Sequence, residues 1–229
     1  GIRIAKMLDD KIDLLNISIG NMYTDPFGKI ICSPMYFDPQ GRNVYLAKAI
    51  KPHMHHCKVG TVGGLTDPEM MEDILASGTA DMVIMARALL ADPYLPKKAK
   101  AGRTEDIRPC MRCLGCLGEA SNRRLIRCDA NPVISRERFY DEIGKAKKRR
   151  RVLVVGGGPG GMQAAITAFD RGHDVVLCEK SDRLGGQLCH ADAVPFKAEL
   201  KRFRDYLICQ VGKRDIDLRL NCTADKELI

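Results

Sequence analysis

The first ninety residues alternate short apolar runs with amphipathic segments. Three apolar runs, each bounded by a glycine or a charged residue, are typical of buried β-strands and lie at residues 13–19, 58–62 and 81–86. Helical patterns separate them at residues 43–51 and 67–76, and Thr66 is expected to cap the second helix. Because strands alternate with helices, the pattern predicts a parallel sheet.

A second α/β unit begins near residue 151. Its expected elements are a strand at 152–155, a glycine-rich turn, a helix at 162–171 and a strand at 174–178. The intervening segment, residues 92–150, is rich in Cys, Arg, Pro and Gly and has only short helical patterns such as 95–101. The fold class is therefore α/β, with a domain boundary near Lys148 and a connector organised by something other than an apolar core.

The glycine turn fits the dinucleotide-binding pattern G-x-G-x-x-G, with its glycines at Gly156, Gly158 and Gly161. Such glycines let the backbone approach a pyrophosphate, and the following helix N-terminus offers free N–H groups. Glu179 stands at the end of the next strand, where a carboxylate would accept the ribose hydroxyls. The complete strand–turn–helix–strand–acid context favours a nucleotide site over a turn that serves helix packing alone. A second glycine pair at residues 185–186 suits FAD.

Cysteine spacing indicates a second kind of site. Cys110, Cys113 and Cys116 lie within seven residues, and Cys128 follows after a gap. Three closely spaced thiolates with a distant fourth favour a [4Fe–4S] cluster, whereas zinc, which stays open as an alternative, more commonly uses two separated C-x-x-C pairs. We interpret the other six as buried thiols, namely Cys32, Cys57, Cys178, Cys189, Cys209 and Cys222. Nearby arginines offset cluster charge or are solvated, namely Arg108, Arg112, Arg123 and Arg124.

Two strand ends of the first unit carry further candidates. Gly63 and Gly64 follow one strand, and Ala86 and Arg87 follow the next. In a β/α barrel, the loops after the last two strands commonly hold a phosphate, to which an arginine adds a bidentate donor. Glycine pairs and arginine caps are also common without a ligand, so both interpretations stay open.

Composition narrows the function classes. The 229 residues are 45% hydrophobic and carry a net charge of +8, much of it in residues 145–151. Such a run is typical of a solvated linker, and scarce aromatics argue against a nucleic-acid surface. No apolar run approaches the roughly 18–20 residues of a membrane span. The first residues show no initiator Met and no signal peptide, so we expect a cytoplasmic fragment with reduced thiols.

In this order, the motifs KVGTVGG, ADMVIMARALLADP, RPCMRCLGCLG with CDANP, and VVGGGPGG resemble one family throughout. The chain resembles the two-flavin iron–sulfur branch of the old yellow enzyme superfamily, which includes 2,4-dienoyl-CoA reductases, 2-enoate reductases, bile-acid-inducible NADH:flavin oxidoreductases and trimethylamine dehydrogenase. The resemblance implies the C-terminal part of an FMN-binding TIM barrel at 1–100, a [4Fe–4S] connector at 101–148, and the start of a Rossmann-like FAD/NAD(P)-binding domain at 149–229.

The resemblance also implies an activity and its residues. Electrons would pass from NAD(P)H through FAD and the cluster to FMN, which reduces an activated C=C bond of a small unsaturated substrate. The residues that match FMN contacts are Gly63, Gly64, Ala86 and Arg87, and the four cysteines of the 110–128 cluster match the metal ligands. The residues that match FAD contacts are Gly158, Pro159, Glu179, Lys180 and Gln187.

The chain departs from this family at one position. Met22 stands where dienoyl-CoA reductases have an active-site histidine, and the adjacent Tyr23 is either a proton donor or a packing residue. Only three of eight barrel strands are expected, so we predict an exposed sheet edge and no turnover by this chain alone. The full-length protein is expected to bind neither nucleic acid nor membrane and to form a homo-oligomer. The alternatives are an amine-type dehydrogenase and, from another class, a zinc-binding nucleic-acid module.

Overall fold

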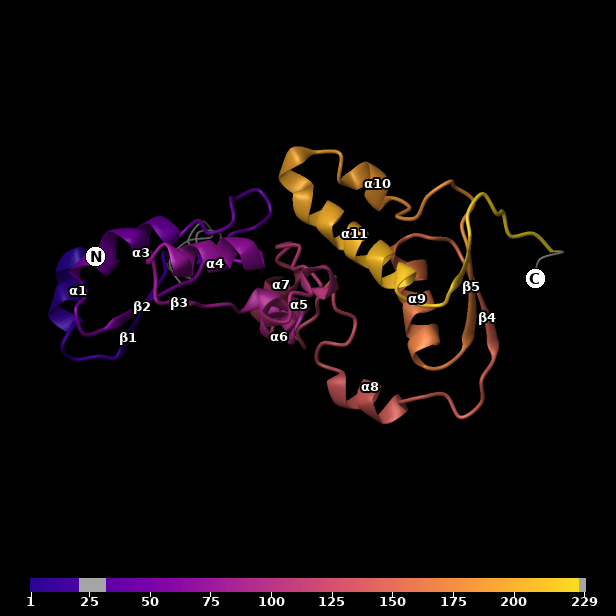
Figure 1. The fold of residues 1–229 in the computed structure, drawn as a ribbon, viewed down its shortest axis with the longest axis horizontal. Coiled ribbons are helices and arrows are strands. Elements are labelled where there is room, and N and C mark those ends of the chain that lie inside the picture. The colour runs from indigo at the N-terminus through magenta and orange to yellow at the C-terminus, as the bar shows by residue number, and fades with distance from the viewer. Residues whose placement is uncertain (21–31, 227–229) are drawn as a thin grey trace.

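Two parallel three-stranded sheets organise the chain, one near each end (Figure 1). The computed structural model describes residues 1–20 and 32–226. The first sheet has the order β1-β2-β3, and its strands are β1 (Leu14–Ile17), β2 (Lys58–Thr61) and β3 (Met82–Val83). Each strand lies inside its expected range and is parallel to its neighbour, so the predicted parallel sheet is confirmed.

Helices flank the first sheet, and one of them begins differently from its prediction. The elements are α1 (Ile2–Leu8), α3 (Val44–Ile50), the 3₁₀ turn η1 (Lys51–His53) and α4 (Pro68–Ala76). Thr66 was the expected cap of α4, and this is wrong. The cap is Asp67, whose carboxylate accepts a hydrogen bond from the backbone N–H of Glu69 at 3.1 Å. The Thr66 hydroxyl is buried and instead donates to Gln40 Oε1 at 2.9 Å.

The middle of the chain is a connector of short helices. These are α5 (Arg87–Ala91), α6 (Leu95–Lys100), the 3₁₀ turn η2 (Thr104–Asp106), α7 (Gly115–Ser121) and α8 (Glu137–Ile143). The predicted helix at 95–101 is α6. Long irregular stretches separate these helices, as the cysteine- and proline-rich sequence predicts.

The second sheet has the order β4-β5-β6, and its strands are β4 (Arg151–Val155), β5 (Asp174–Cys178) and β6 (Asp217–Arg219). Its helices are α9 (Pro159–Asp170), α10 (Leu188–Ala191) and α11 (Ala198–Gly212), and Pro195–Lys197 forms the 3₁₀ turn η3. Helix α9 starts three residues before its predicted start. Pro159 explains the difference, because its fixed φ suits the first helical turn and its missing N–H is not needed there.

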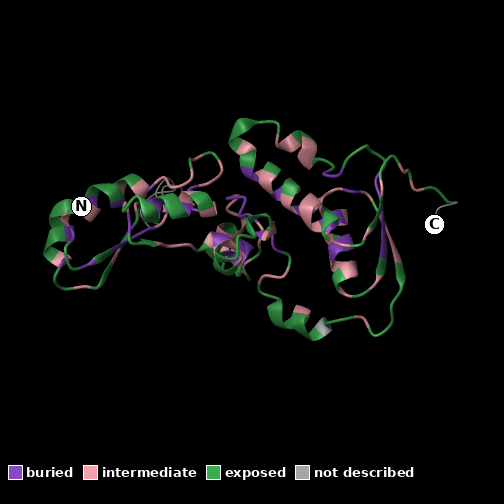
Figure 2. Cartoon of the chain, in the orientation of Figure 1, coloured by how far each residue is buried: buried purple, intermediate pink, exposed green. Residues whose placement is uncertain are grey.

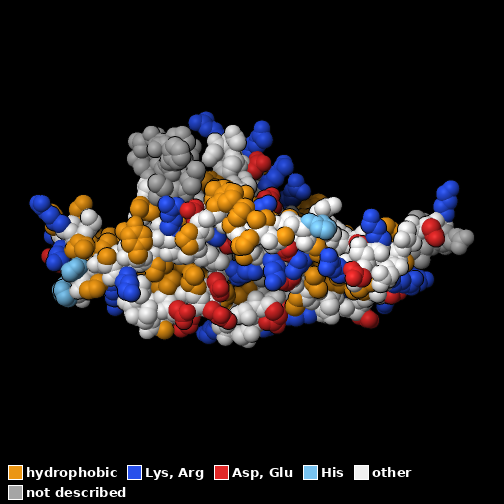
Figure 3. Space-filling model, turned by 90° about the horizontal axis from the view of Figure 1, so that it is seen from above, with side chains coloured by type: hydrophobic (Ala, Val, Ile, Leu, Met, Phe, Trp, Pro, Cys, Tyr) orange, Lys and Arg blue, Asp and Glu red, His pale blue; other side chains and the backbone are white. Residues whose placement is uncertain are grey.

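Each sheet has its own apolar core (Figure 2). Val59 and Ile50 are buried in the first, and Met162, Leu177 and Leu207 in the second. Strand residues of both sheets nevertheless expose apolar side chains, namely Leu14, Met82, Val155 and Leu218. Figure 3 shows hydrophobic side chains spread between clusters of Lys and Arg on the face it presents. Apolar surface of both sheets is therefore uncovered in the described chain.

Two further expectations concern composition. All ten cysteines lie in the described part and are free thiols, but the expectation that the six unclustered ones are buried holds only for Cys57 and Cys178. Cys32, Cys189, Cys209 and Cys222 are partly exposed. The lysines and arginines of residues 145–151 are exposed, but Arg151 already belongs to β4 and Arg149 pairs with Asp174, so only part of this run is a linker. Within residues 1–20 and 32–226, no helix has the length and apolarity to cross a membrane.

Candidate functional site

The glycine turn between β4 and α9 has a geometry that only glycine allows. A Cβ at Gly161 would lie 1.8 Å from the carbonyl oxygen of Gly156, and Gly156 itself has φ +99°. Gly158 caps α9 with extended backbone, and Pro159 is the first helical residue. The turn is therefore followed directly by a twelve-residue helix, whose first N–H groups have no partner within the helix.

Glu179 directly follows β5, and its side chain contacts this turn. Its Oε2 accepts a hydrogen bond from the backbone N–H of Gly157 at 2.6 Å, and its Oε1 accepts one from Ser181 N–H at 2.8 Å. The backbone N–H groups of Ser181 and Gly157 hold the pKa of this buried carboxyl below its usual value. An ionised carboxylate thus lies at the carboxyl end of β5 beside the turn.

The second glycine pair packs on the first turn. Gly185 N–H donates to the carbonyl of Gly157 at 2.9 Å, and a Cβ at Gly186 would lie 2.9 Å from the Cα of Gly158. Gln187 caps α10 just beyond, and both Gln187 and Lys180 are exposed. The residues predicted to bind FAD therefore gather at the carboxyl edge of the second sheet.

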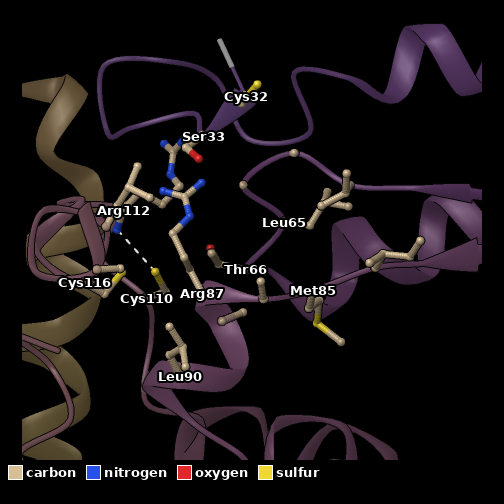
Figure 4. Close-up of a pocket in the computed structure, with 18 of the residues that line it drawn as sticks. Cys32, Ser33, Leu65, Thr66, Met85, Arg87, Leu90, Cys110, Arg112 and Cys116 are labelled. Atoms are coloured by element: carbon tan, nitrogen blue, oxygen red, sulfur yellow. Dashed lines mark hydrogen bonds between the residues drawn. The ribbon is translucent and has the colours of Figure 1, made fainter. Parts of the chain in front are cut away.

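The candidates of the first unit line a single cavity of about 260 Å³ (Figure 4). Gly63 and Gly64 follow β2 with φ +150° and +68°, and Ala86 and Arg87 follow β3. The structure brings all four predicted residues together. Cys110, Cys116 and Arg112 line the same cavity, so it reaches from the strand ends to the cysteine cluster.

Arg87 is one of two arginines that line this cavity, the other being Arg112. Burial lowers the pKa of Arg87, partly offset by the neighbouring thiols of Cys110 and Cys116. Its Nη1 is buried and has no hydrogen-bond partner among the described residues. A desolvated guanidinium with a free N–H group is suited to an anionic ligand.

Two polar side chains near this cavity were missed from the sequence. The side-chain amide of Asn43 and the hydroxyl of Thr61 are both fully buried and have no partner in the described part of the chain. A Cβ at Gly63 would lie 3.0 Å from Asn43 Nδ2, so the amide abuts the glycine pair. Thr61 lies inside the motif KVGTVGG but was not singled out there, and Asn43 belongs to no motif.

The four cysteines of the cluster line a second, smaller cavity together with Arg87 and Arg112. Cys110 Sγ accepts a hydrogen bond from the backbone N–H of Arg112 at 3.4 Å, and the Cys113 thiol donates to Asp129 Oδ2 at 3.0 Å. Burial, followed by the bond to Asp129, raises the pKa of Cys113 to about 12. Within residues 1–20 and 32–226, no three His, Cys, Asp or Glu side chains are grouped closely enough to hold a metal ion, so the four thiols line one cavity without converging on a common point.

The loop that carries these cysteines is locally unusual. Arg112 and Leu114 adopt left-handed backbone, with φ +51° and +63°. Of the four arginines noted beside the cysteines, Arg112 is buried, whereas Arg123 and Arg124 are exposed as solvated side chains. The predicted catalytic candidate Tyr23 and the neighbouring Met22 lie outside the described residues.

Comparisons with known proteins match both halves of the chain. Residues 33–106 match the NADH:flavin oxidoreductase / NADH oxidase family, and residues 151–206 match the FAD dependent oxidoreductase family. These two segments contain the first cavity's glycines and the glycine turn, respectively.

Individual relatives cover the whole chain. An NADH oxidase of Thermoanaerobacter brockii is 46% identical over 100% of this chain and 35% of its own length. A cinnamate reductase of Clostridium sporogenes is 35% identical over 100% of this chain and 34% of its own length. A solved 2-naphthoyl-CoA reductase in complex with 2-naphthoyl-CoA superposes with a TM-score of 0.91 at 33% identity, covering 100% of this chain and 34% of that one. The chain thus spans about a third of the length of these relatives.

Proposed function

Because this chain belongs to the NADH:flavin oxidoreductase / NADH oxidase family and continues into an FAD-dependent oxidoreductase segment, we propose that it is part of an NAD(P)H-dependent reductase of activated C=C bonds. One observation carries the proposal. The predicted phosphate-binding residues Gly64 and Arg87 line the same cavity as Cys110 and Cys116 of the cysteine cluster. A flavin held at the strand ends would therefore lie beside the cysteines.

The proposed organisation has three parts. Residues 1–100 are the C-terminal part of a TIM barrel that binds FMN, residues 101–148 are an iron–sulfur connector, and residues 149–229 begin a Rossmann-like FAD/NAD(P)-binding domain. Support comes from the two separate parallel sheets and from the short-helix segment between them.

In the first part, the chain's own residues would bind the FMN phosphate. The left-handed backbone at Gly63 and Gly64 lets that loop approach a ligand closely, and Ala86 leads into α5 beside it. The unpartnered Nη1 of Arg87 would donate to a phosphate oxygen and regain the hydrogen bond that burial denies it.

In the last part, the glycine turn would hold FAD. The N-terminus of α9, reached through Gly156, Gly158, Pro159 and Gly161, would bind the pyrophosphate. Glu179 would accept the ribose hydroxyls, with Lys180 and Gln187 nearby.

The donor chemistry of the cysteine cavity supports the proposal of an iron–sulfur cluster. Its donor set consists of four thiols and contains no histidine, and the N–H of Arg112 already donates to one sulfur. To hold a cluster, the four thiols would turn toward a common point, and Cys113 would give up its hydrogen bond to Asp129. When bound, the groups would supply hydride acceptance from NAD(P)H at FAD, one-electron transfer through the cluster, and delivery from FMN of a hydride to one alkene carbon, with a proton to the other.

The names of two similar proteins support a substrate class. Cinnamate and 2-naphthoyl-CoA, named in two of them, are unsaturated acyl compounds, so we propose a small unsaturated substrate of this type. Tyr23 remains the candidate for the proton donor. The proposed location is the reducing cytoplasm, where free thiols and NAD(P)H coexist.

The test is anaerobic purification of the full-length protein, followed by FMN, FAD, iron and sulfide analysis and an NADH-dependent assay with enoates. We expect both flavins, about four irons per chain, and enoate reduction. Cys110→Ser should lose iron, whereas the control Cys209→Ser, at a partly exposed cysteine on α11, should keep it.

Two outcomes would replace the proposal. Oxidation of amines without enoate reduction would indicate an amine-type dehydrogenase. A protein that holds one zinc and no flavin would indicate the zinc-binding nucleic-acid module.

A further inference from the structure

Arg112 occupies an unusual position between two of the candidate cluster ligands. It adopts left-handed backbone, which a residue with a side chain adopts only at a cost in conformational energy. Its side chain is 3% exposed, although arginine is almost never fully buried without a partner. Some compensating contact must hold it there.

Two contacts hold the guanidinium, and they come from different parts of the molecule. Nε and Nη2 donate to Oε1 of Glu199 at 2.8 and 2.5 Å, and Nη1 donates to the carbonyl oxygen of Asp38 at 2.7 Å. Glu199 lies in the first turn of α11 in the second unit and is itself buried, whereas Asp38 belongs to the loop before α3 in the first unit. One side chain of the connector therefore ties both units together.

The same residue also contacts both the cysteine cluster of the connector and the phosphate loop of the first unit. Its backbone N–H donates to Cys110 Sγ, and a Cβ at Gly64 would lie 3.4 Å from Arg112 Cδ. In Figure 4, the side chains of Arg112 and Arg87 extend to the same end of the cavity, beside Ser33. Movement of Arg112 would thus displace a cluster ligand and the phosphate loop together.

We propose that Arg112 is a positioning residue that fixes the spacing between the FMN phosphate loop and the cysteine cluster through its buried contacts with Glu199 and Asp38. This inference rests on the proposed function. The planar guanidinium of arginine binds two separate acceptors in fixed directions. The ammonium group of lysine is a point charge and does not fix these directions. Docking of α11 would thereby set the geometry of a flavin site in the other unit.

A second ion pair between the second unit and the connector provides the matched control. Lys213, the residue that caps the end of α11, binds Glu105 and Asp106 of η2 at 2.9 and 2.6 Å. This pair is partly exposed and touches neither the cysteines nor the phosphate loop, so its loss removes a contact of the connector with the second unit without moving either site.

The experiment uses the full-length holoprotein and measures the FMN-to-FAD ratio after gel filtration and the separate rates of FAD and FMN reduction by NADH. In Arg112→Lys, we expect most of the FMN to be lost while FAD is retained. Reduction of the FMN that stays bound should slow about tenfold or more, because the flavin is misplaced relative to the cysteine cluster. FAD reduction should stay near the wild-type rate, and Lys213→Gln should resemble wild type in every measurement.

A double variant distinguishes loss of positioning from loss of folding. Arg112→Met with Glu199→Leu replaces the buried pair with apolar side chains, which often preserves stability. It should fold and still lose FMN selectively. Parallel loss of both flavins, or retention of FMN and of the normal FMN reduction rate in the folded double variant, would overturn the inference. Absence of flavins or iron from the wild-type protein would instead overturn the proposed function.

Discussion

The two sheets use the same device, a glycine turn at the carboxyl end of a strand, but they assemble their sites differently. In the second unit, the turn, the acid and the second glycine pair all lie between Gly156 and Gly186, and they bind one another through Glu179 and Gly185. In the first unit, the cavity draws on Gly64, Arg87 and the cysteine loop, which are separated along the chain.

Hydrogen bonding shows the consequence of this difference. The carboxylate of Glu179 is satisfied by two backbone N–H groups. Around the first cavity, Asn43, Thr61 and Arg87 each keep a buried polar atom without a partner in the described residues. Buried polar groups are nearly always paired in folded proteins, so the first site depends more on a ligand or on further chain than the second does.

The largest expected effect is on the second site, whose residues are held by contacts with one another. Gly161→Ala would place a Cβ against a backbone oxygen at 1.8 Å, where no side-chain rotation relieves the clash. We expect the second unit to lose about 3 kcal/mol of stability, the upper range for overpacking, together with FAD binding. Thermal unfolding and retained FAD of the full-length protein measure this.

Gly160→Ala is its matched control. No atom lies within 4 Å of a Cβ at Gly160, which stands in the first turn of α9. Alanine is better than glycine in a helix by up to about 1 kcal/mol, so the melting temperature of the flavin-free protein should not fall. Equal damage from both substitutions would show that the turn's geometry is not the cause.

A smaller effect is expected in the first site. Arg87→Gln removes the only charge that we assign to the FMN phosphate, and a hydrogen bond to a charged group contributes about 1.5–3 kcal/mol. The dissociation constant of FMN should rise about 10- to 100-fold, while FAD affinity stays unchanged. Titration of the FMN-depleted full-length protein, followed by flavin fluorescence, checks this.

Lys97→Gln, at an exposed lysine of α6, is the control for a general loss of positive charge. It should leave FMN affinity unchanged. If Arg87→Gln also left FMN affinity unchanged, the FMN phosphate would be bound elsewhere. The unpartnered Nη1 of Arg87 would then be no evidence that the first site depends on a ligand more than the second does.

The same contrast explains how much could be predicted from sequence. The arrangement of the residues at the second candidate site was predictable because they lie within one strand–turn–helix–strand unit, where spacing fixes geometry. The contact of Arg112 with Glu199 joins residues 87 positions apart, and local patterns carry no information about such pairs. The wrong cap at Thr66 was a failure of a different kind, because Asp67 directly before Pro68 is itself a helix-start signal.

The smallest expected effect concerns a second carboxylate bound by backbone N–H groups, Asp9 at the end of α1. Its oxygens accept from the N–H groups of His55, His56 and Cys57 at 3.0–3.1 Å. The N–H of Cys57 is the main cause that lowers the pKa of Asp9 from 3.8 to about 2. Unlike Glu179, this carboxylate borders neither candidate site, so its contribution should be to stability alone.

The sign of the pH effect follows from the lowered pKa. A carboxyl that is more acidic when folded stabilises the fold in its ionised form, so the stabilisation is complete above pH 3.8 and disappears as the pH falls toward 2. The melting temperature of Asp9→Asn, measured without flavin or metal, should therefore lie below wild type at pH 7 and approach it at pH 3. Asp10→Asn, at a neighbouring carboxylate with a 71% exposed side chain, should match wild type at every pH. If the melting temperature of Asp9→Asn differed from wild type by the same amount at every pH, the stabilising effect of Asp9 would come from its shape and not from its charge. Asp9 and Glu179 would then share their hydrogen-bonding pattern but not the effect of their charge.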